Sequence, residues 1–449
     1  MAHSPRGTSE AAAGKSPAGA HPASSRYAWY VLAVLTLANV GGFVDRQILS
    51  LLVVPIRHDL GISDTQVSLL MGLAFSIFYT VLGLPLGWLA DRASRKAIMG
   101  WGVAAWSIMT AACGLAGSFG RLLATRIGVG VGEATLVPAA TSFIPDYFPP
   151  EKLGTAMSVF SLGIFLGSGL AYVIGGAVVG ALEAHGSVIV PLVGAVRPWQ
   201  SVFFVVGLPG LIVALLFLTV REPPRGSKER GATTAELFAY VNTHRRSFVC
   251  TSLGFSFSAM VNYGIAGWLA TFLIRMYGWT AAHAGAVQGV LTMTVGVVGV
   301  LAGGRVADWY ARRGHTDGPL RVGVIGAAGM LVSATAYPLM PSATLCVAWL
   351  VVVNFFAAFP WGAIGASAAE IVPARMRAQG SALYFLVLSL VSSTLGPTLV
   401  ALITDHVFHA DSALRYSLAI ANVAGMSAAI IVLIYGMPAY RRTIATRGE

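Results

Sequence analysis

The sequence predicts an all-α membrane protein with twelve transmembrane helices in two pseudo-symmetric six-helix bundles. Three observations support this prediction. Of the 449 residues, 56% are hydrophobic and 10% are charged, whereas soluble domains carry about 25% charged residues. Apolar runs of roughly 20 residues, each long enough to cross a ~30 Å hydrocarbon core, recur from end to end. The third observation is a polar motif that occurs twice, each time after such a run.

The repeated motif reads Gly-x-x-Ala-Asp, then three residues, then two adjacent basic residues. One copy runs from Gly87 to Lys96 and the other from Gly304 to Arg313. Their acids, Asp91 and Asp308, are 217 positions apart. The same offset, without a gap, relates Gly61 to Gly278, Ser63 to Thr280 and Gly72 to Gly289. A repeat of this length in an apolar chain indicates two copies of one membrane bundle.

The spans follow from the apolar runs and the helix breakers between them. They are expected at 27–56, 64–90, 96–117, 121–144, 151–182, 199–220, 246–276, 280–307, 320–340, 343–370, 375–404 and 412–437. Ser63 and Gln66 form a capping box that opens the second span, and Thr280 is the equivalent cap of the eighth.

The placement of Lys and Arg sets the orientation. If the N-terminal tail is cytoplasmic, 22 basic residues lie on the cytoplasmic side and four on the outer side, namely Arg57, Arg197, Arg275 and Arg415. Both termini are therefore expected in the cytoplasm. The formal charge of +11 then reflects membrane topology and not a nucleic-acid partner. The expected domains are a disordered cytoplasmic tail (1–26), an N-terminal bundle (27–221), a cytoplasmic linker (222–245), a C-terminal bundle (246–438) and a cytoplasmic tail (439–449).

Six plus six spans, a basic cytoplasmic side, a long central loop and the repeated motif resemble the major facilitator superfamily over residues 27–438. The resemblance implies alternating access and a latch that closes the cytoplasmic side. Asp91 would bind the start of the eleventh helix, and Asp308 would face the fifth; the alternative is that the basic residues only set topology. The expected latch comprises Gly87, Asp91, Arg92, Arg95, Lys96, Gly304, Asp308, Arg312, Arg313, Arg375 and Arg377.

Four charged residues stand out within the predicted spans: Asp45 and Arg46 in the first, Arg126 and Glu133 in the fourth. Each costs about 2.5–3.5 kcal/mol on insertion scales and so requires a partner or a role. Arg126 and Glu133 are two helical turns apart and share one face. At ~1.5 Å per residue, Asp45 and Glu133 should lie at nearly the same depth.

These charges permit two interpretations. They could form a static buried ion network, which is often purely structural. Alternatively Asp45, Arg126 and Glu133 could couple transport to protons, as intramembrane acids commonly do. Because an arginine does not deprotonate in a protein, the titrating group would have to be one of the two acids, with Arg126 moving to switch it.

The repeat adds a difference between the halves. At the offset of 217, Asp45-Arg46 corresponds to Asn262-Tyr263 in the seventh span, where the polar groups are uncharged. Titration would then be confined to the N-terminal half, while Arg46, Asn262 and Tyr263 line a substrate cavity. Asn262 could instead hydrogen-bond between helices as part of the packing.

The Asp45-Arg46 pair, the Asp91-Arg92 motif and the run from Arg126 to Ala134 resemble the Spinster family of sphingolipid and lysolipid transporters. This resemblance implies proton-driven transport of a lipid-like amphiphile. Residues that could form a wall for its acyl chain, or else face lipid or core, are Phe255, Phe257, Met260, Tyr263, Trp268, Phe355, Phe356, Phe359 and Trp361.

The fifth span contains Gly163-x-x-x-Gly167 followed by Ser168. It resembles the antiporter signature of the superfamily, although Ser168 stands where that signature has proline. Simple close packing of helices is the other explanation.

Other functions remain open from the sequence: a proton-coupled efflux pump for hydrophobic drugs, a uniporter or symporter, or a transport-dead receptor or scaffold. No nucleotide loop, metal cluster or nucleophile–base pattern is present in the sequence, so we expect no enzyme activity, catalytic residue, cofactor or metal. We expect a multi-pass monomer of the plasma or inner membrane, with the amphiphile, protons and membrane lipids as partners.

Asp45→Asn is predicted to abolish pH-driven transport, because it removes a titratable group from the N-terminal half. Asn262→Ala should change substrate affinity and leave the pH dependence intact, because it removes only a neutral hydrogen-bonding group. Transport measured against pH for both variants checks the difference. Equal loss of coupling in both would contradict it.

Overall fold

The computed structural model describes residues 25–90, 92–186, 188–190, 194–223 and 233–446. Asp91, almost all of the predicted N-terminal tail and residues 224–232 of the predicted linker lie outside these residues. The described chain is helical apart from a hairpin of β1 (Val188–Val190) and β2 (Gly194–Val196), paired antiparallel.

Each predicted span in the N-terminal half corresponds to a helix or a pair of consecutive helices. These helices are α1 (Ser25–Leu51), α3 (Asp64–Met71) with α4 (Leu73–Ala90), α5 (Arg95–Cys113), α6 (Phe119–Glu133) with α7 (Leu136–Phe143), α8 (Pro150–His185) and α9 (Pro198–Thr219). A short helix, α2 (Val53–Leu60), follows α1, and the 3-10 turn η1 (Ile144–Asp146) follows α7.

The C-terminal half follows the same plan. Its helices are α11 (Arg245–Tyr277), α12 (Ala281–Leu291) with α13 (Val297–Arg312), α14 (Gly318–Ala336), α15 (Ala343–Ala358) with α16 (Trp361–Glu370), α17 (Arg377–Leu402) and α18 (Leu414–Ala445). Two π-helical segments, η2 (Thr292–Gly296) and η5 (Ile403–Phe408), interrupt the eighth span and end the eleventh, and the 3-10 turns are η3 (Tyr337–Leu339), η4 (Ala374–Met376) and η6 (Asp411–Ala413).

Eleven helical segments of the described chain are long and apolar enough to cross a membrane. The remaining predicted span is the 19-residue α5, which packs between α6 and α9 in the same bundle. The fold is therefore the predicted all-α membrane architecture.

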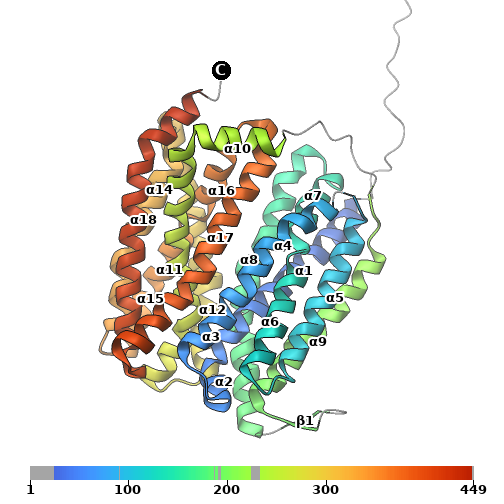
Figure 1. Cartoon of the computed structure of the whole chain (residues 1–449), viewed down its shortest axis with the longest axis vertical. Coiled ribbons are helices and arrows are strands. Elements are labelled where there is room, and N and C mark those ends of the chain that lie inside the picture. Colours follow the sequence, from blue (N-terminus) through green and yellow to red (C-terminus); the bar gives the residue numbers. More distant parts are fainter. Residues whose placement is uncertain (1–24, 91, 187, 191–193, 224–232, 447–449) are drawn as a thin grey trace, which may run out of the picture.

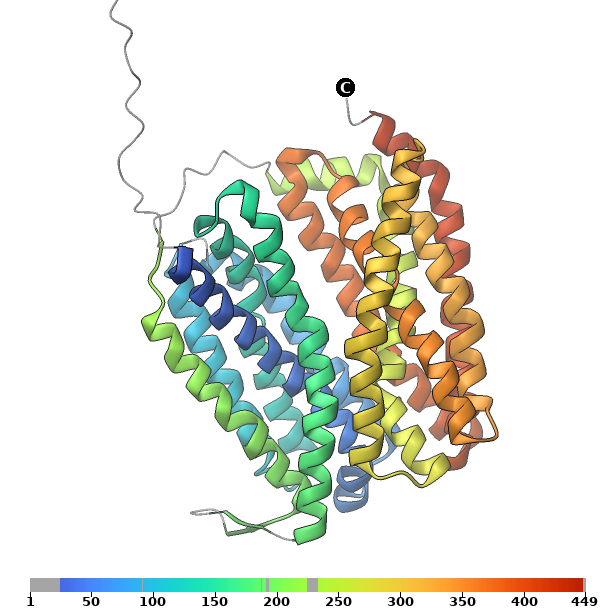
Figure 2. The same cartoon turned by 180° about the vertical axis from the view of Figure 1, so that it is seen from behind.

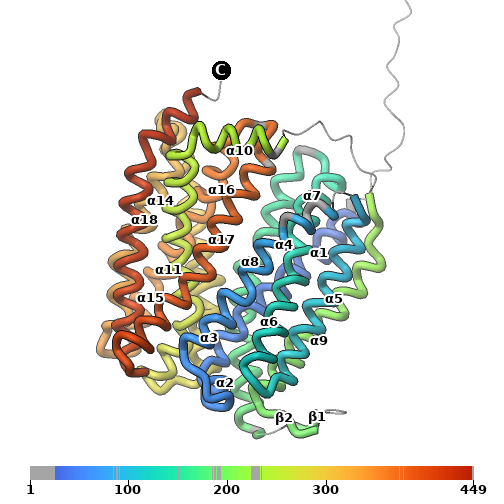
Figure 3. Tube along the Cα trace, viewed as in Figure 1, coloured from blue at the N-terminus to red at the C-terminus, as the bar shows by residue number. Residues whose placement is uncertain are grey.

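The helices form two groups that lie side by side, α1–α9 and α11–α18 (Figures 1 and 2). We call the end with the β1–β2 hairpin the hairpin face, and the end with α10 (Thr234–Thr243) and the last residues of α18 the termini face (Figure 3). Helix α10 lies on the C-terminal bundle, where Tyr240 Oη donates to the carbonyl oxygen of Ile371 at 3.2 Å.

The hydrophobic core differs between the two faces. Toward the hairpin face, one cluster of buried residues includes members of both bundles, for example Leu52, Trp199, Trp268 and Leu418. Toward the termini face there are two separate clusters, one within each bundle. The buried core cluster that the two bundles share thus lies in the hairpin half of the described structure.

The repeat seen in the sequence is present in the backbone. Gly61 and Gly278 both end a helix in the left-handed region, at φ 61° and 65°, where a side chain would be strained. The Ser63–Gln66 capping box is formed, and Thr280 caps α12 by accepting from the main-chain N–H of His283. These predictions are confirmed.

The ion pairs described at the termini face join residues of the same bundle. In the N-terminal bundle, Arg95 pairs with Asp146 at 2.6 Å and with Glu222 at 3.0 Å. In the C-terminal bundle, the buried Asp317 accepts from Arg321 Nε at 3.0 Å and from Arg441 Nε at 2.9 Å. Burial alone would raise the pKa of Asp317, but the hydrogen bonds and charges of the two arginines outweigh it and lower this pKa below its ordinary value.

Asp317→Asn is expected to lower the free energy of unfolding at pH 7 by about 1–3 kcal/mol, because two arginines lose their charged acceptor. A carboxyl with a lowered folded-state pKa stabilises the fold above its unfolded pKa of about 3.9, and that stabilisation is lost as the pH falls through the folded-state pKa. Thermal unfolding in detergent from pH 7 to pH 3 should show the wild type and variant converging. A difference that stays constant with pH would contradict the assignment.

Candidate functional site

The four charges predicted inside the spans lie close together where α1 meets α6 in the N-terminal bundle. Asp45 and Glu133 are each 3% exposed, and Arg126 is fully buried. Arg46 lies nearer to open space, with 20% of its side chain exposed. The acids point into protein and not toward surrounding lipid, as the prediction required.

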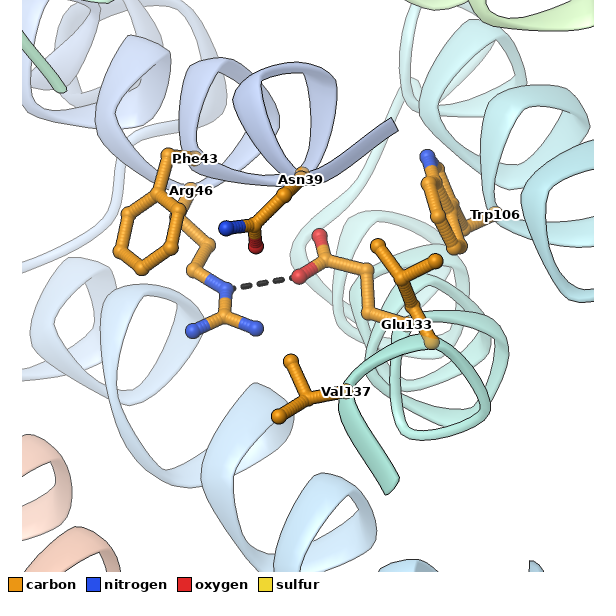
Figure 4. Close-up of a pocket in the computed structure, with 8 residues that line it drawn as sticks. Asn39, Phe43, Arg46, Trp106, Glu133 and Val137 are labelled. Carbon is orange, nitrogen blue, oxygen red and sulfur yellow. Dashed lines mark hydrogen bonds and ion pairs between the residues drawn. The ribbon is translucent and has the colours of Figure 1, made fainter. Parts of the chain in front are cut away.

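Glu133 is held by Arg46. The Nε atom of Arg46 donates to Oε2 of Glu133 at 2.6 Å (Figure 4). The second carboxylate oxygen of Glu133, Oε1, is buried and has no hydrogen-bond partner among the described residues. One oxygen of this acid is therefore neutralised and the other remains available to a proton or a water molecule.

The guanidinium group of Arg46 is surrounded by aromatic rings. Its Cζ atom lies 4.4 Å from the ring centre of Phe75, 4.7 Å from that of Tyr79 and 5.0 Å from that of Phe43. Each contact is attractive because the face of an aromatic ring is electronegative. The three rings and Glu133 together hold this guanidinium group in place.

Arg126 does not pair with Glu133 in this conformation, although the sequence placed them on one helical face. Its Nη1 donates to the main-chain oxygen of Asp45 at 3.1 Å, and its Nε has no partner among the described residues. The Oδ1 atom of Asp45 is also buried without a partner there. The shared face was correct, but the cation that reaches Glu133 comes from α1.

A small cavity adjoins the ion pair. Its size is about 10 Å³, close to the room that one water molecule needs. Figure 4 shows the side chains that converge on it from α1, α6 and their neighbours. The lining residues are Asn39, Gly42, Phe43, Arg46, Trp106, Glu133, Leu136 and Val137.

The two residues predicted to complete the substrate cavity are on α11, in the other bundle. Tyr263 is half-buried and lies within electrostatic range of Arg46. Asn262 is also half-buried and donates to the carbonyl oxygen of Ser258 in its own helix at 3.1 Å. The structure thus brings Tyr263 to the site, while the hydrogen bond described for Asn262 stays within α11.

Of the nine residues suggested for an acyl-chain wall, four are buried in the core and five are partly buried. Trp268 is fully buried and donates to the carbonyl oxygen of Pro397 at 2.9 Å. The ring of Phe356 lies over Gly329 of α14, and Phe255 is fully buried. Of the alternatives, packing within the C-terminal bundle accounts for these residues. Trp361 differs, since it contacts Phe165 of α8 across the bundles at 6.5 Å between ring centres.

The ion pairs described for the predicted latch residues stay within one bundle. Asp91 lies outside it, and Gly87 falls near the end of α4. Asp308 is exposed, without an ion pair among the described residues, and a side chain at Gly304 would meet open space. Arg95 pairs within its own bundle, and Lys96 Nζ donates to the carbonyl oxygen of Val220. The remaining predicted latch residues are exposed: Arg92, Arg312, Arg313, Arg375 and Arg377.

The glycines of the fifth span act in close packing. A Cβ atom on Gly163 would lie 2.9 Å from Asn39 Nδ2, and one on Gly167 would lie 2.8 Å from Phe43 Cβ. Both glycines therefore allow α1 to approach α8. Gly169 faces the other bundle, where its Cβ would lie 2.1 Å from Met293 Cγ.

Sequence reasoning missed a group of charged residues at the hairpin face, which pair between the bundles: Arg57, Asp64, Arg275, Asp405 and Asp411. Arg57 and Arg275 entered the sequence analysis only as counts for topology. The one available signal was that acids lie near these arginines at the ends of apolar runs.

Arg46→Met is expected to destabilise the fold by about 3 kcal/mol, because Glu133 would stay buried without its cation. Adding Glu133→Gln should recover most of that loss, and acidic pH should reduce the loss in the single variant, since a protonated acid needs no cation. Chemical unfolding in detergent measures both effects. Losses in the double variant that equal the sum of the two single losses would show that the pair does not act as a unit.

Comparison with known proteins agrees with the fold. The family model of the Major Facilitator Superfamily matches residues 35–397. An MFS-type efflux pump of Mycolicibacterium smegmatis is 28% identical over 384 residues, which cover 85% of each protein. Protein spinster of Drosophila melanogaster is 30% identical over 333 residues, 72% of this chain but only about half (51%) of the fly protein.

Among solved structures, a bacterial homologue of the human lysosomal transporter Spinster, in an inward-facing and unoccupied conformation, aligns with a TM-score of 0.77. It is 29% identical in sequence, and the alignment covers 95% of this chain and 99% of that one. The chain therefore belongs to the major facilitator superfamily of transporters and, within it, is related to the Spinster proteins.

Proposed function

We propose that this transporter moves a lipid-like amphiphile of the sphingolipid or lysophospholipid class across the membrane by alternating access, coupled to protons. The observation that carries the proposal is the buried Arg46–Glu133 pair, with one carboxylate oxygen left unbonded next to a cavity of about one water molecule. A static network would be expected to satisfy both oxygens.

The proton step follows from the chemistry of the pair. Arginine keeps its charge, so a proton that arrives must bind an acid. Protonation of Glu133 removes the negative charge that holds Arg46, and the 20% exposed guanidinium is then free to bind another anion. Asp45, with its own unbonded oxygen, is the second acceptor. Uptake and release of a proton thereby control how strongly Arg46 can hold a ligand.

An amphiphile fits the surroundings of Arg46. The cation supplies one site for an anionic group such as a phosphate, while Phe43, Phe75 and Tyr79 provide apolar surface directly beside it. A small polar solute would require more hydrogen-bonding side chains than these. The relation to Spinster proteins supports the same class of substrate.

Efflux of hydrophobic drugs is the second candidate. The relative from Mycolicibacterium smegmatis, which this chain covers over 85% of its length, is named an MFS-type efflux pump. Such a pump would use the same acids, and only competition between substrates separates the two functions.

We further propose that the termini face is cytoplasmic and that the protein acts as a monomer in the plasma or inner membrane. The basic residues of the chain gather on the side of the termini, as cytoplasmic loops do. In this orientation the buried core cluster shared by the two bundles lies toward the outer side of the membrane.

A flux assay in proteoliposomes tests the function. Labelled lysophospholipid should cross faster when a pH gradient is imposed, and unlabelled lysophospholipid should compete better than a cationic drug. Glu133→Gln should abolish the stimulation by the gradient while exchange without a gradient persists, because the proton acceptor is lost but the pathway is not. Glu151→Gln, an exposed acid at the start of α8, is the matched control and should behave as wild type.

Two results would overturn the proposal. Flux of lysophospholipid that is indifferent to the pH gradient in the wild type would exclude proton coupling. Transport of the drug without any competition from lysophospholipid would assign the protein to drug efflux.

A further inference from the structure

At the hairpin face, a fully buried acid of one bundle is bound by an arginine of the other. Asp64, at the first turn of α3, is 0% exposed. Arg275 near the end of α11 donates from Nη1 to Oδ2 at 2.7 Å and from Nη2 to Oδ1 at 2.8 Å. This bidentate geometry is the strongest arrangement of an arginine with a carboxylate.

Two further contacts flank this pair, and both also join the bundles. Arg57 of α2 lies 3.5 Å from Oδ1 of Asp64 and hydrogen-bonds to Asp411 of η6. Thr65 donates from its main-chain nitrogen and from its hydroxyl to Oδ2 of Asp405, each at 2.7 Å. The pairing is reciprocal, since each bundle contributes an arginine and at least one acid.

The charges at the two faces of the molecule are used differently. At the termini face the described ion pairs stay within a bundle, as for Arg95 with Glu222 and Asp317 with Arg441. Pairing across bundles is therefore not a general result of having charges at helix ends. It occurs where the bundles also share one apolar core.

The internal repeat does not generate this network. At the offset of 217, Asp64 corresponds to Ala281 of α12. There the contact between bundles is backbone packing: a Cβ atom on Gly176 would lie 2.8 Å from the carbonyl oxygen of Ala281. One of the two symmetry-related seams thus carries charge, and the other is packed closely at glycines such as Gly176.

We propose that Arg57, Asp64, Thr65, Arg275, Asp405 and Asp411 form a hairpin-face latch, which holds that face closed and whose Asp64–Arg275 pair must separate before substrate can pass there. The hairpin-face latch rests on the proposed function, because it requires transport by alternating access. Its role is conformational, and it is independent of the identity of the cargo.

The energetics support a latch over incidental contacts. Water is excluded from Asp64, so its attraction to Arg275 is much stronger than between exposed charges. Removing either partner weakens the compensation of the other in the closed state, where Asp64 would keep only Arg57 at 3.5 Å. The open state is not affected, because both groups are hydrated when the face opens. Loss of one partner therefore favours the open state, and by about ten-fold or more if the pair behaves as buried pairs do.

The distance between the bundles can be measured directly with spin labels. Leu115→Cys and Val407→Cys place labels on exposed positions of the two bundles at the hairpin face, while the three native cysteines are buried. Pulsed electron–electron double resonance in nanodiscs, without substrate, should give one population with a short distance between the two labels for the wild type. Asp64→Asn and Arg275→Gln should each raise the ratio of open to closed molecules by about ten-fold.

Two comparisons make the test specific. If the residues act through each other, the double variant shifts the ratio no further than either single variant. Asp59→Asn is the matched control, because Asp59 lies at the same face but pairs with Arg197 and Trp199 of its own bundle; it should leave the distances unchanged. Asp405→Asn weakens a flanking contact, because a neutral amide oxygen replaces the charged acceptor of Thr65. It should give a smaller shift in the same direction, and it tests the latch also if the Asp64 variant does not fold.

Unchanged distances in Asp64→Asn and Asp405→Asn, or effects of Asp64→Asn and Arg275→Gln that simply add, would overturn the latch. Because the measurement contains no cargo, a failure of lysophospholipid flux would leave this result unaffected. Conversely, pH-driven flux that persists with unchanged distances would retain the proposed function and remove the latch.

Discussion

A charged side chain inside an apolar helix bundle must be paired, and in this transporter the partners show which parts of the molecule belong together. In the middle of the N-terminal bundle, Glu133 is neutralised by Arg46 of a neighbouring helix. At the termini face the described pairs stay within one bundle, and at the hairpin face Asp64 and Arg275 connect the two. The pairing therefore divides the structure into two bodies that are joined at one end.

Apolar packing leads to the same division independently. One core cluster crosses between the bundles near the hairpin face, and two separate clusters fill the bundles near the termini face. Burial of apolar surface and pairing of charge are different physical effects, yet both place the contact between the bundles at the hairpin face. The arrangement matches the inward-facing conformation named for the related bacterial structure, if the termini face is cytoplasmic.

The sequence was sufficient for the architecture, because the constraints there are local or repeated. Apolar runs gave the spans, and the offset of 217 found Gly61 and Gly278, whose shared left-handed conformation the structure confirms. Burial of Asp45 and Glu133 was predictable from their position in the spans. Their partners were not, since a helical face does not reveal which neighbour it meets. The Asp64–Arg275 pair could not be predicted for the same reason. Its residues are 211 positions apart and are not related by the repeat.

The seam between α8 and α12 has a mechanical consequence. Its contacts are made by backbone at Gly176, Gly285 and Gly289, where any added Cβ atom would collide with the facing chain. The close approach of the two helices at these glycines makes this seam a suitable pivot between the bundles. The seam between α3 and α17, on the opposite side of the molecule, is instead fastened by polar groups such as Thr65 and Asp405 (Figures 1 and 2). If the two bundles pivot at the seam between α8 and α12, they separate most at the seam between α3 and α17.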